Sequence, residues 1–216
     1  MSRPFVIWGC SGLAKVLTSA ITNQGDYVCA FFDKNNVPSI VPEIPIYIGE
    51  DGFYKWVKEI EDTSSINALV AIGGHRGSDR IKLQKIFKDA GFMLDPLIHS
   101  TAYVCTTARI GQGSQVLAQA GVSADSVIGD ACIINHKASI DHECVLGNGV
   151  HLAPGATLCG CVTVGDNVMI GAGSVVLPRL KIGPDSIIGA GAVVTKDVPA
   201  GSVMVGNPAR LINASR

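Results

Sequence analysis

Three consecutive residues near the middle of the chain, Asp141, His142 and Glu143, place an imidazole between two carboxylates. A neutral imidazole accepts a proton near physiological pH, and a carboxylate bonded to its other nitrogen fixes the tautomer and stabilises the imidazolium. Such a pair suits general base catalysis, in which the imidazole takes a proton from an attacking nucleophile. A lone histidine is more often a hydrogen-bonded structural residue, so the surrounding pattern must decide between the two roles.

The surrounding pattern is a six-residue repeat, or hexad, that runs from Ile98 to Pro199 without insertion or deletion. The first position of all seventeen hexads is aliphatic, and the fifth is mostly Ala, Ser or Cys. This period matches neither an amphipathic helix nor a long alternating strand, and fixed self-similarity is typical of a solenoid. We expect each hexad to supply one short strand and one corner, so that three hexads close a triangular coil of eighteen residues.

In this prism His142 occupies the third hexad position, and one coil of eighteen residues places it between Ala124 and Gly160. Both neighbours are small, which leaves space over the imidazole. His136 has the same position one hexad earlier, on the neighbouring face, and is a candidate for substrate contact or a competing base. His151 closes its hexad and is expected at a corner. Corners with positive φ are expected at the glycines that follow aliphatic positions, which are Gly111, Gly129, Gly147, Gly165, Gly171, Gly183 and Gly189.

Composition excludes several classes of function. Net charge is −1 and 16% of the 216 residues are charged, so no basic surface indicates nucleic-acid binding. The sequence contains no run of eighteen apolar residues and begins without a signal-peptide pattern, which predicts a cytoplasmic protein without membrane insertion.

The seven cysteines are an odd number, and two of them, Cys132 and Cys144, occupy the small inward hexad position. These two are predicted core residues. Cys159 and Cys161 form the only close pair and lack a second pair at zinc-finger spacing. We therefore expect no metal.

The first 95 residues lack the repeat and alternate predicted strands with predicted helices. The strands are expected at residues 4–7, 27–32 and 68–72, and the helices at 13–21, 53–60 and 79–90. This order predicts a small doubly wound α/β domain, in which ligands bind beyond the carboxyl ends of the strands. The domains are therefore expected at 1–95 for the α/β part, 96–205 for the solenoid and 206–216 for an exit segment.

Three segments follow the predicted strands of this domain: 9–12, Asp33 with Lys34, and 73–75. A glycine turn that opens a helix presents free N–H groups to an anion. The turn lacks the full G-x-G-x-x-G, so by pattern alone a ligand site and a structural turn are equally supported. Asp33 could equally be a solvated loop acid, and for His75 a simple loop role is favoured.

Taken together, these features resemble the hexapeptide-repeat sugar acyltransferases with a left-handed parallel β-helix, in particular bacterial UDP-4-amino-sugar N-acetyltransferases of bacillosamine synthesis. The resemblance covers nearly the whole chain, and it rests on the hexads and on five short segments: Gly9-Cys10-Ser11-Gly12, Asp33, Ala71-Ile72-Gly73, residues 133–144 and Gly206-Asn207-Pro208-Ala209-Arg210. The left-handed winding comes from the resemblance alone, since general topology favours right-handed crossovers.

The resemblance implies an acetyl-CoA-dependent N-acetyltransferase that acts on the 4-amino group of a nucleotide-linked amino-dideoxy sugar, as a homotrimer and without a metal. It identifies His142 as the general base and Glu143 as the acid that raises its basicity, with Asn135 in the same catalytic segment. Acetyl-CoA is expected to contact His151 and the backbone at Gly160, Ala172 and Ala190. The nucleotide-sugar is expected at Ser11, Gly12, Leu13, Asp33, Lys34 and Gly73.

Two residues depart from the family pattern. Leu13 follows Gly12 where these enzymes commonly have a histidine, and His136 stands where they have a small or hydroxyl residue. Both departures bear on which nucleotide and sugar are accepted. Two alternatives remain open: O-acetylation of a sugar or sialic acid with the same base, and a non-catalytic scaffold that binds a nucleotide-sugar. The nucleotide, the length of the acyl group and the glycan pathway are not determined by the sequence.

Overall fold

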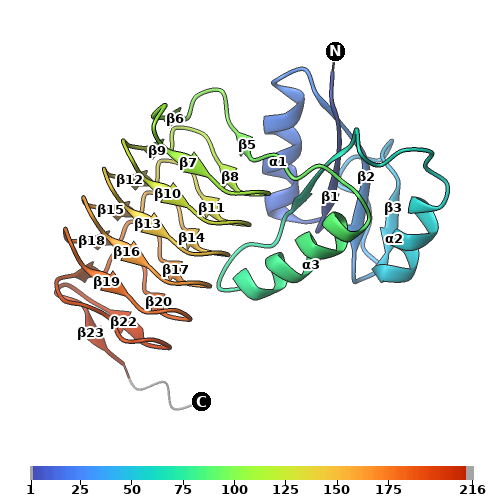
Figure 1. Cartoon of the computed structure of the whole chain (residues 1–216). Helices are drawn as coiled ribbons and strands as arrows, with labels where there is room; N and C mark the ends of the chain where they lie inside the picture. Colours follow the sequence, from blue (N-terminus) through green and yellow to red (C-terminus); the bar gives the residue numbers. More distant parts are fainter. Residues whose placement is uncertain (1, 213–216) are drawn as a thin grey trace. The chain divides into compact units, whose positions relative to one another are not determined.

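The computed structural model describes residues 2–212 and divides into two compact units. The first, here called the N-terminal unit, contains the residues up to 73 together with 82–95. The second, here called the β-helix unit, contains residues 74–81 and the chain from 96 onward. One of the three boundaries along the chain, between residues 81 and 82, therefore falls within helix α3 (Gly77–Asp89) (Figure 1). None of the helices over the described residues is long and apolar enough to cross a membrane.

The N-terminal unit is built on a parallel four-stranded sheet in the order β3-β2-β1-β4, which confirms the predicted α/β class. Its strands are β1 (Pro4–Trp8), β2 (Tyr27–Asp33), β3 (Ile46–Ile48) and β4 (Asn67–Val70), and its other helices are α1 (Gly12–Thr22) and α2 (Gly49–Val57). The short edge strand β3 was not predicted. It is half-exposed, so it carries no buried apolar run that periodicity could reveal.

Buried aromatic side chains form the core of this unit. The rings of Trp8, Phe32, Phe53 and Phe87 lie 5.1–6.1 Å apart, and all six pairs are tilted or edge-to-face. Each ring buries a large apolar area, and such geometries add a favourable quadrupole term. The cluster packs helices against the sheet and so holds the strand ends in place.

The β-helix unit contains seventeen strands of two residues each, β5 to β21, one per hexad. These strands recur every six residues. In chain order they are β5 (Leu97–Ile98), β6 (Tyr103–Val104), β7 (Arg109–Ile110), β8 (Gln115–Val116), β9 (Gly121–Val122), β10 (Val127–Ile128), β11 (Ile133–Ile134), β12 (Ser139–Ile140), β13 (Val145–Leu146), β14 (His151–Leu152), β15 (Thr157–Leu158), β16 (Thr163–Val164), β17 (Met169–Ile170), β18 (Val175–Val176), β19 (Lys181–Ile182), β20 (Ile187–Ile188) and β21 (Val193–Val194). Figure 1 shows the coils stacked along the axis of this unit. The predicted left-handed parallel β-helix is confirmed.

Every third strand belongs to the same face, and each strand pairs in parallel with the strand eighteen residues away. Ile133, for example, lies opposite Gln115 on one side and His151 on the other. The last coil is closed by β22 (Val203–Val205) and the antiparallel β23 (Arg210–Leu211). The aliphatic residues of successive hexads therefore stack in continuous, almost fully buried columns.

The inward fifth positions are filled as predicted. Cys132 and Cys144 are fully buried among aliphatic side chains, which confirms them as core residues. Burial raises the pKa of Cys144 to about 11 and that of Cys132 to about 12. Both therefore remain neutral thiols at physiological pH.

The expectation that the glycines after aliphatic positions take positive φ is wrong. Left-handed φ values of 52° to 68° occur instead at the fourth hexad position, and nine of these residues are not glycine. Gly129 has an ordinary φ and is needed for a different reason. A Cβ on it would lie 2.6 Å from the carbonyl carbon of Gly147 in the next coil. These glycines let successive coils approach closely and do not form the turn.

The close approach predicts an asymmetry between two glycines of the β-helix. Gly129→Ala should lower the free energy of unfolding by about 2 kcal/mol or more, because the new methyl group overlaps backbone that cannot move without breaking the coil register. Gly121→Ala is the matched control, since its Cβ would meet nothing within 4 Å. Urea unfolding of both variants measures the difference, and equal midpoints would contradict the packing argument.

Candidate functional site

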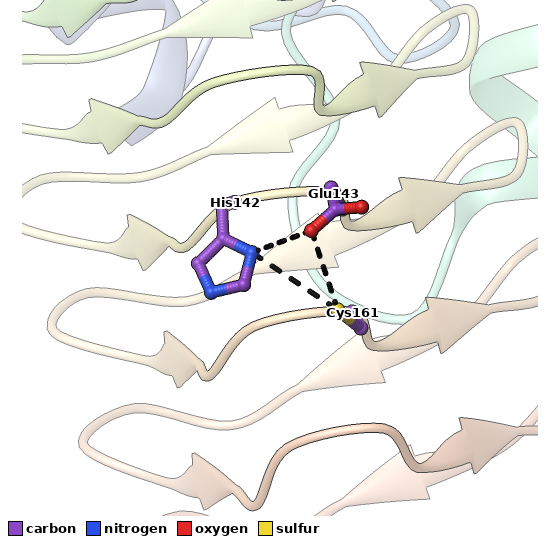
Figure 2. A group of neighbouring side chains, drawn as sticks. All are labelled: His142, Glu143 and Cys161. Carbon is purple, nitrogen blue, oxygen red and sulfur yellow. Dashed lines mark hydrogen bonds and ion pairs between the residues drawn. The ribbon is translucent and has the colours of Figure 1, made fainter.

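Figure 2 shows His142 and Glu143 side by side at a corner of the β-helix that follows β12. Nδ1 of His142 lies 2.9 Å from Oε2 of Glu143, and the backbone N–H of His142 donates to Oδ1 of Asp141 at 2.8 Å. The side chains of His142 and Glu143 are 48% and 62% exposed. The pair is therefore both organised and open to a substrate.

Backbone geometry explains why adjacent residues can pair in this way. Glu143 occupies the left-handed fourth position with φ of 58°, which turns its side chain toward the ring of the preceding residue. Its N–H donates to the carbonyl of Ala124 in the coil below, and the carbonyl of His142 accepts from Cys161 in the coil above, both at 2.9 Å. The corner is thus held from both sides.

The other ring nitrogen of His142 lies over the backbone of Gly160. A Cβ at Gly160 would fall 2.5 Å from Nε2, so any larger residue would displace the imidazole. The predicted small neighbour that leaves room for the ring is confirmed at this position. Because Glu143 accepts the Nδ1 proton, the neutral ring carries its lone pair on Nε2.

Asn135 lies beside another corner, where its side chain contacts His136 and His151 rather than His142. Its Oδ1 accepts from the backbone N–H of His136 at 2.8 Å and lies 2.9 Å from Nδ1 of the same residue. Its amide nitrogen lies 3.2 Å from Nε2 of His151. The ring of His136 is thus oriented by a neutral amide, which cannot stabilise an imidazolium as the Glu143 carboxylate can.

The expected corner position of His151 is wrong. His151 opens strand β14, because each two-residue strand consists of the sixth position of one hexad and the first of the next. Its ring is only 6% exposed. Nδ1 lies 3.0 Å from the N–H and 3.4 Å from the carbonyl of Gly74, so either tautomer finds a partner there.

A buried arginine accompanies this histidine, and the sequence analysis did not find it. Arg80 is fully buried, and its guanidinium donates to the carbonyls of Ala131 at 2.9 Å, Gly149 at 2.6 Å and Gly74 at 3.3 Å. Burial lowers the pKa of Arg80 to about 10. Segment 74–81 is thereby fastened to the β-helix by backbone acceptors of two successive coils.

Burial and the nearby Arg80 charge together lower the pKa of His151 to about 4. The ring is therefore neutral at physiological pH. The predicted contact with acetyl-CoA stays a prediction, since the nitrogens of this ring already face Gly74 and Asn135.

The three small residues expected along acetyl-CoA do not share one edge of the prism. Gly160 adjoins His142, whereas Ala172 and Ala190 belong to the corner of His136, one and two coils beyond Pro154. The backbone of that second corner is open at two of its glycines, where a Cβ would meet nothing within 4 Å. These glycines are Gly173 and Gly191.

The residues expected to bind the nucleotide-sugar lie at the carboxyl ends of β1, β2 and β4. Ser11 precedes α1 without capping it, and Gly12 and Leu13 form the first turn of that helix. The Asp33 carboxylate accepts the N–H of Cys10 at 2.9 Å and that of Asn35 at 2.9 Å. Asp33 thus joins the β1 and β2 loops, a structural task that the pattern could not distinguish from ligand binding. Lys34 and Gly73 follow β2 and β4.

Two family models match this chain. Residues 4–86 match the family model described as the PglD N-terminal domain, and residues 125–160 and 161–196 match that of the bacterial transferase hexapeptide (six repeats). No curated protein sequence gives a significant match.

Solved structures match over almost the whole chain. A histidine-to-asparagine mutant of perosamine N-acetyltransferase from Caulobacter crescentus, in complex with CoA and GDP-perosamine, is 35% identical with a TM-score of 0.89, over 97% of both chains. The acetyltransferase domain of PglB from Neisseria gonorrhoeae, in complex with acetyl coenzyme A, is 32% identical with a TM-score of 0.88, over 98% of this chain and 100% of that one. WeeI from Acinetobacter baumannii is 27% identical with a TM-score of 0.86, over 98% and 100%.

The buried His151 predicts acid sensitivity. Between the unfolded pKa near 6.5 and the folded value of about 4, the unfolded chain binds a proton that the folded chain does not. The free energy of unfolding should therefore fall as the pH decreases through this window, by about 3 kcal/mol in total. Unfolding between pH 7.5 and 4 should show this loss in the native chain and much less of it in His151→Gln. Identical pH profiles would contradict the assignment.

Proposed function

Because the chain belongs to the hexapeptide-repeat bacterial sugar acyltransferases with a PglD-type N-terminal domain, we propose that it transfers an acetyl group from acetyl-CoA to the 4-amino group of a nucleotide-linked amino-dideoxy sugar. The Caulobacter crescentus relative, a perosamine N-acetyltransferase that binds CoA and GDP-perosamine, supports the acceptor class. The Neisseria gonorrhoeae domain in complex with acetyl coenzyme A supports the donor.

The observation that carries the proposal is the His142–Glu143 pair. Nδ1 of His142 contacts Glu143, whereas Nε2 points away from Glu143 and lies next to Gly160. In the reaction the sugar amine attacks the thioester carbonyl, and Nε2 of His142 accepts the amine proton as the new C–N bond forms. The C–S bond then breaks, and the His142 imidazolium passes its proton to the CoA thiolate as it leaves. The Glu143 carboxylate stabilises the imidazolium that exists between these steps.

The remaining site residues receive roles that follow from their positions. The nucleotide-sugar binds at the carboxyl ends of β1, β2 and β4 in the N-terminal unit. The free N–H groups at the start of α1, which follows β1, suit its phosphates. Ser11, Gly12 and Lys34 contact this ligand, and Leu13 and Gly73 shape its surroundings. Asp33 contributes by holding the loop after β1.

Acetyl-CoA lies along the open backbone edges of the β-helix unit. Gly160, Ala172 and Ala190 permit its close approach, while His151 and Asn135 support the corner of His136 from within. Gly160 and the two alanines belong to different corners of one prism, so a homotrimer, in which neighbouring prisms could face each other, suits this placement.

Thiol release from acetyl-CoA tests the proposal with GDP-, UDP- and dTDP-linked 4-amino-dideoxy sugars as acceptors. One of them should be turned over, and His142→Ala should lower kcat by about 10²–10⁴-fold without a change in melting temperature. The matched control is His136→Ala, which replaces the ring that has only an amide partner, and it should affect kcat much less.

Three results would contradict the proposal. Exclusive turnover of hydroxyl acceptors would show that the enzyme is an O-acetyltransferase. Full activity in His142→Ala would show that His142 is not the general base. Binding of the nucleotide-sugar without any acetyl transfer would favour a non-catalytic scaffold.

A further inference from the structure

A third donor atom lies beside the His142–Glu143 pair and has no part in the reaction just described. Sγ of Cys161 lies 3.7 Å from Oε2 of Glu143 and 4.0 Å from Nδ1 of His142, and the latter two atoms are 2.9 Å apart (Figure 2). Within residues 2–212, no other three His, Cys, Asp or Glu side chains converge in this way.

The backbone holds these donors in register. Glu143 and Cys161 occupy the same left-handed corner position in successive coils, with φ of 58° and 61°. The N–H of Cys161 donates to the carbonyl of His142 at 2.9 Å, which couples the third donor to the first. The polar atoms of the three side chains therefore meet at one corner, as Figure 2 shows.

The spacing suits a tetrahedral metal centre. Zinc bonds of about 2.0–2.2 Å to nitrogen and oxygen and about 2.3 Å to sulfur separate tetrahedral ligands by about 3.4–3.6 Å. The three observed separations of 2.9, 3.7 and 4.0 Å bracket these values. Shifts of about half an ångström are enough, and the exposed His142 and Glu143 side chains can make them by rotation.

We propose that His142, Glu143 and Cys161 form a binding site for a zinc-like divalent metal ion, and that the bound ion switches off the general base. Imidazole, carboxylate and thiolate are the donors that zinc selects, and three of them leave a fourth position for water or an external thiol. The ion is an inhibitor and plays no part in the folding or the chemistry of the enzyme.

Proton accounting explains the inhibition. The metal takes the Nδ1 lone pair that becomes available when the ring proton moves to Nε2, so the neutral ring no longer has a free lone pair to receive the amine proton. Glu143 leaves Nδ1 to coordinate the ion. The Cys161 thiol loses its proton to solvent as the metal–sulfur bond forms. Metal binding and base function are therefore mutually exclusive at this residue.

Cobalt(II), a spectroscopic substitute for zinc, tests the site without any assay of activity. Titration of the untagged chain with Co²⁺ should produce a thiolate-to-metal charge-transfer band in the near ultraviolet and intense visible bands of tetrahedral cobalt. Zinc should abolish both. Cys161→Ala should lose these bands, whereas the matched control Cys105→Ala should keep them.

Cys105 is a demanding control because it is a competing thiol. It is partly exposed, and hydrogen bonds from Thr107 lower its pKa, so it would bind cobalt if thiolate character alone were sufficient. Absence of the charge-transfer band in the native chain, or its persistence in Cys161→Ala, would overturn the metal site.

A second measurement tests the switch, which is the one part of the inference that rests on the proposed function. Zinc should inhibit acetyl transfer by the native chain, a chelator should restore the rate, and Cys161→Ala should need at least tenfold more zinc for half-inhibition. Occupancy of the site without loss of rate would overturn the switch. A chain without metal that transfers no acetyl group would refute the proposed function instead, and the cobalt result would still stand.

Discussion

The parallel pairing of residues eighteen positions apart is the constraint on which the β-helix unit depends. Each two-residue strand is hydrogen-bonded to the coil below and the coil above, so a single inserted residue would move every later side chain out of its column. The same register forces glycine at Gly129 and Gly147, where the backbones of successive coils touch. Chemistry on this scaffold has to use the corners, because the strands and the interior are committed to packing.

The candidate active site uses the corner geometry directly. A left-handed residue other than glycine is unfavourable by about 1–2 kcal/mol, and at Glu143 the adjacent coils stabilise it through fixed backbone hydrogen bonds. In return the carboxylate reaches the ring of the residue before it. Gly160 completes the arrangement from the next coil by leaving room for the ring. The general base His142, its partner Glu143 and the small residue that makes room for the ring thus belong to two successive coils at the same corner.

The features that repeat were predictable from sequence, and those that depend on a single tertiary contact were not. Seventeen uninterrupted hexads predict the coils, their core columns and the vertical neighbours of His142 because each position recurs. Arg80 carries no such signal, because in the sequence it looks like any charged residue on a helix. Only the structure shows that its guanidinium is buried and donates to backbone carbonyls instead of to solvent. His151 was assigned to a corner because the repeat does not show at which of its positions each strand begins. The hexad fixes its position in the coil, but segment 74–81 determines what covers its ring.

The central claim is that Nε2 of His142, oriented by Glu143, accepts the proton of the attacking amine. Chemical rescue tests it most directly, because His142→Ala leaves an opening next to Gly160 that a free imidazole can enter. The account predicts that added imidazole restores acetyl transfer in His142→Ala in proportion to its unprotonated fraction, with saturation, and has no such effect on His136→Ala. An inert His142→Ala that imidazole does not rescue, together with rescue of His136→Ala, would contradict the account and move the base to His136.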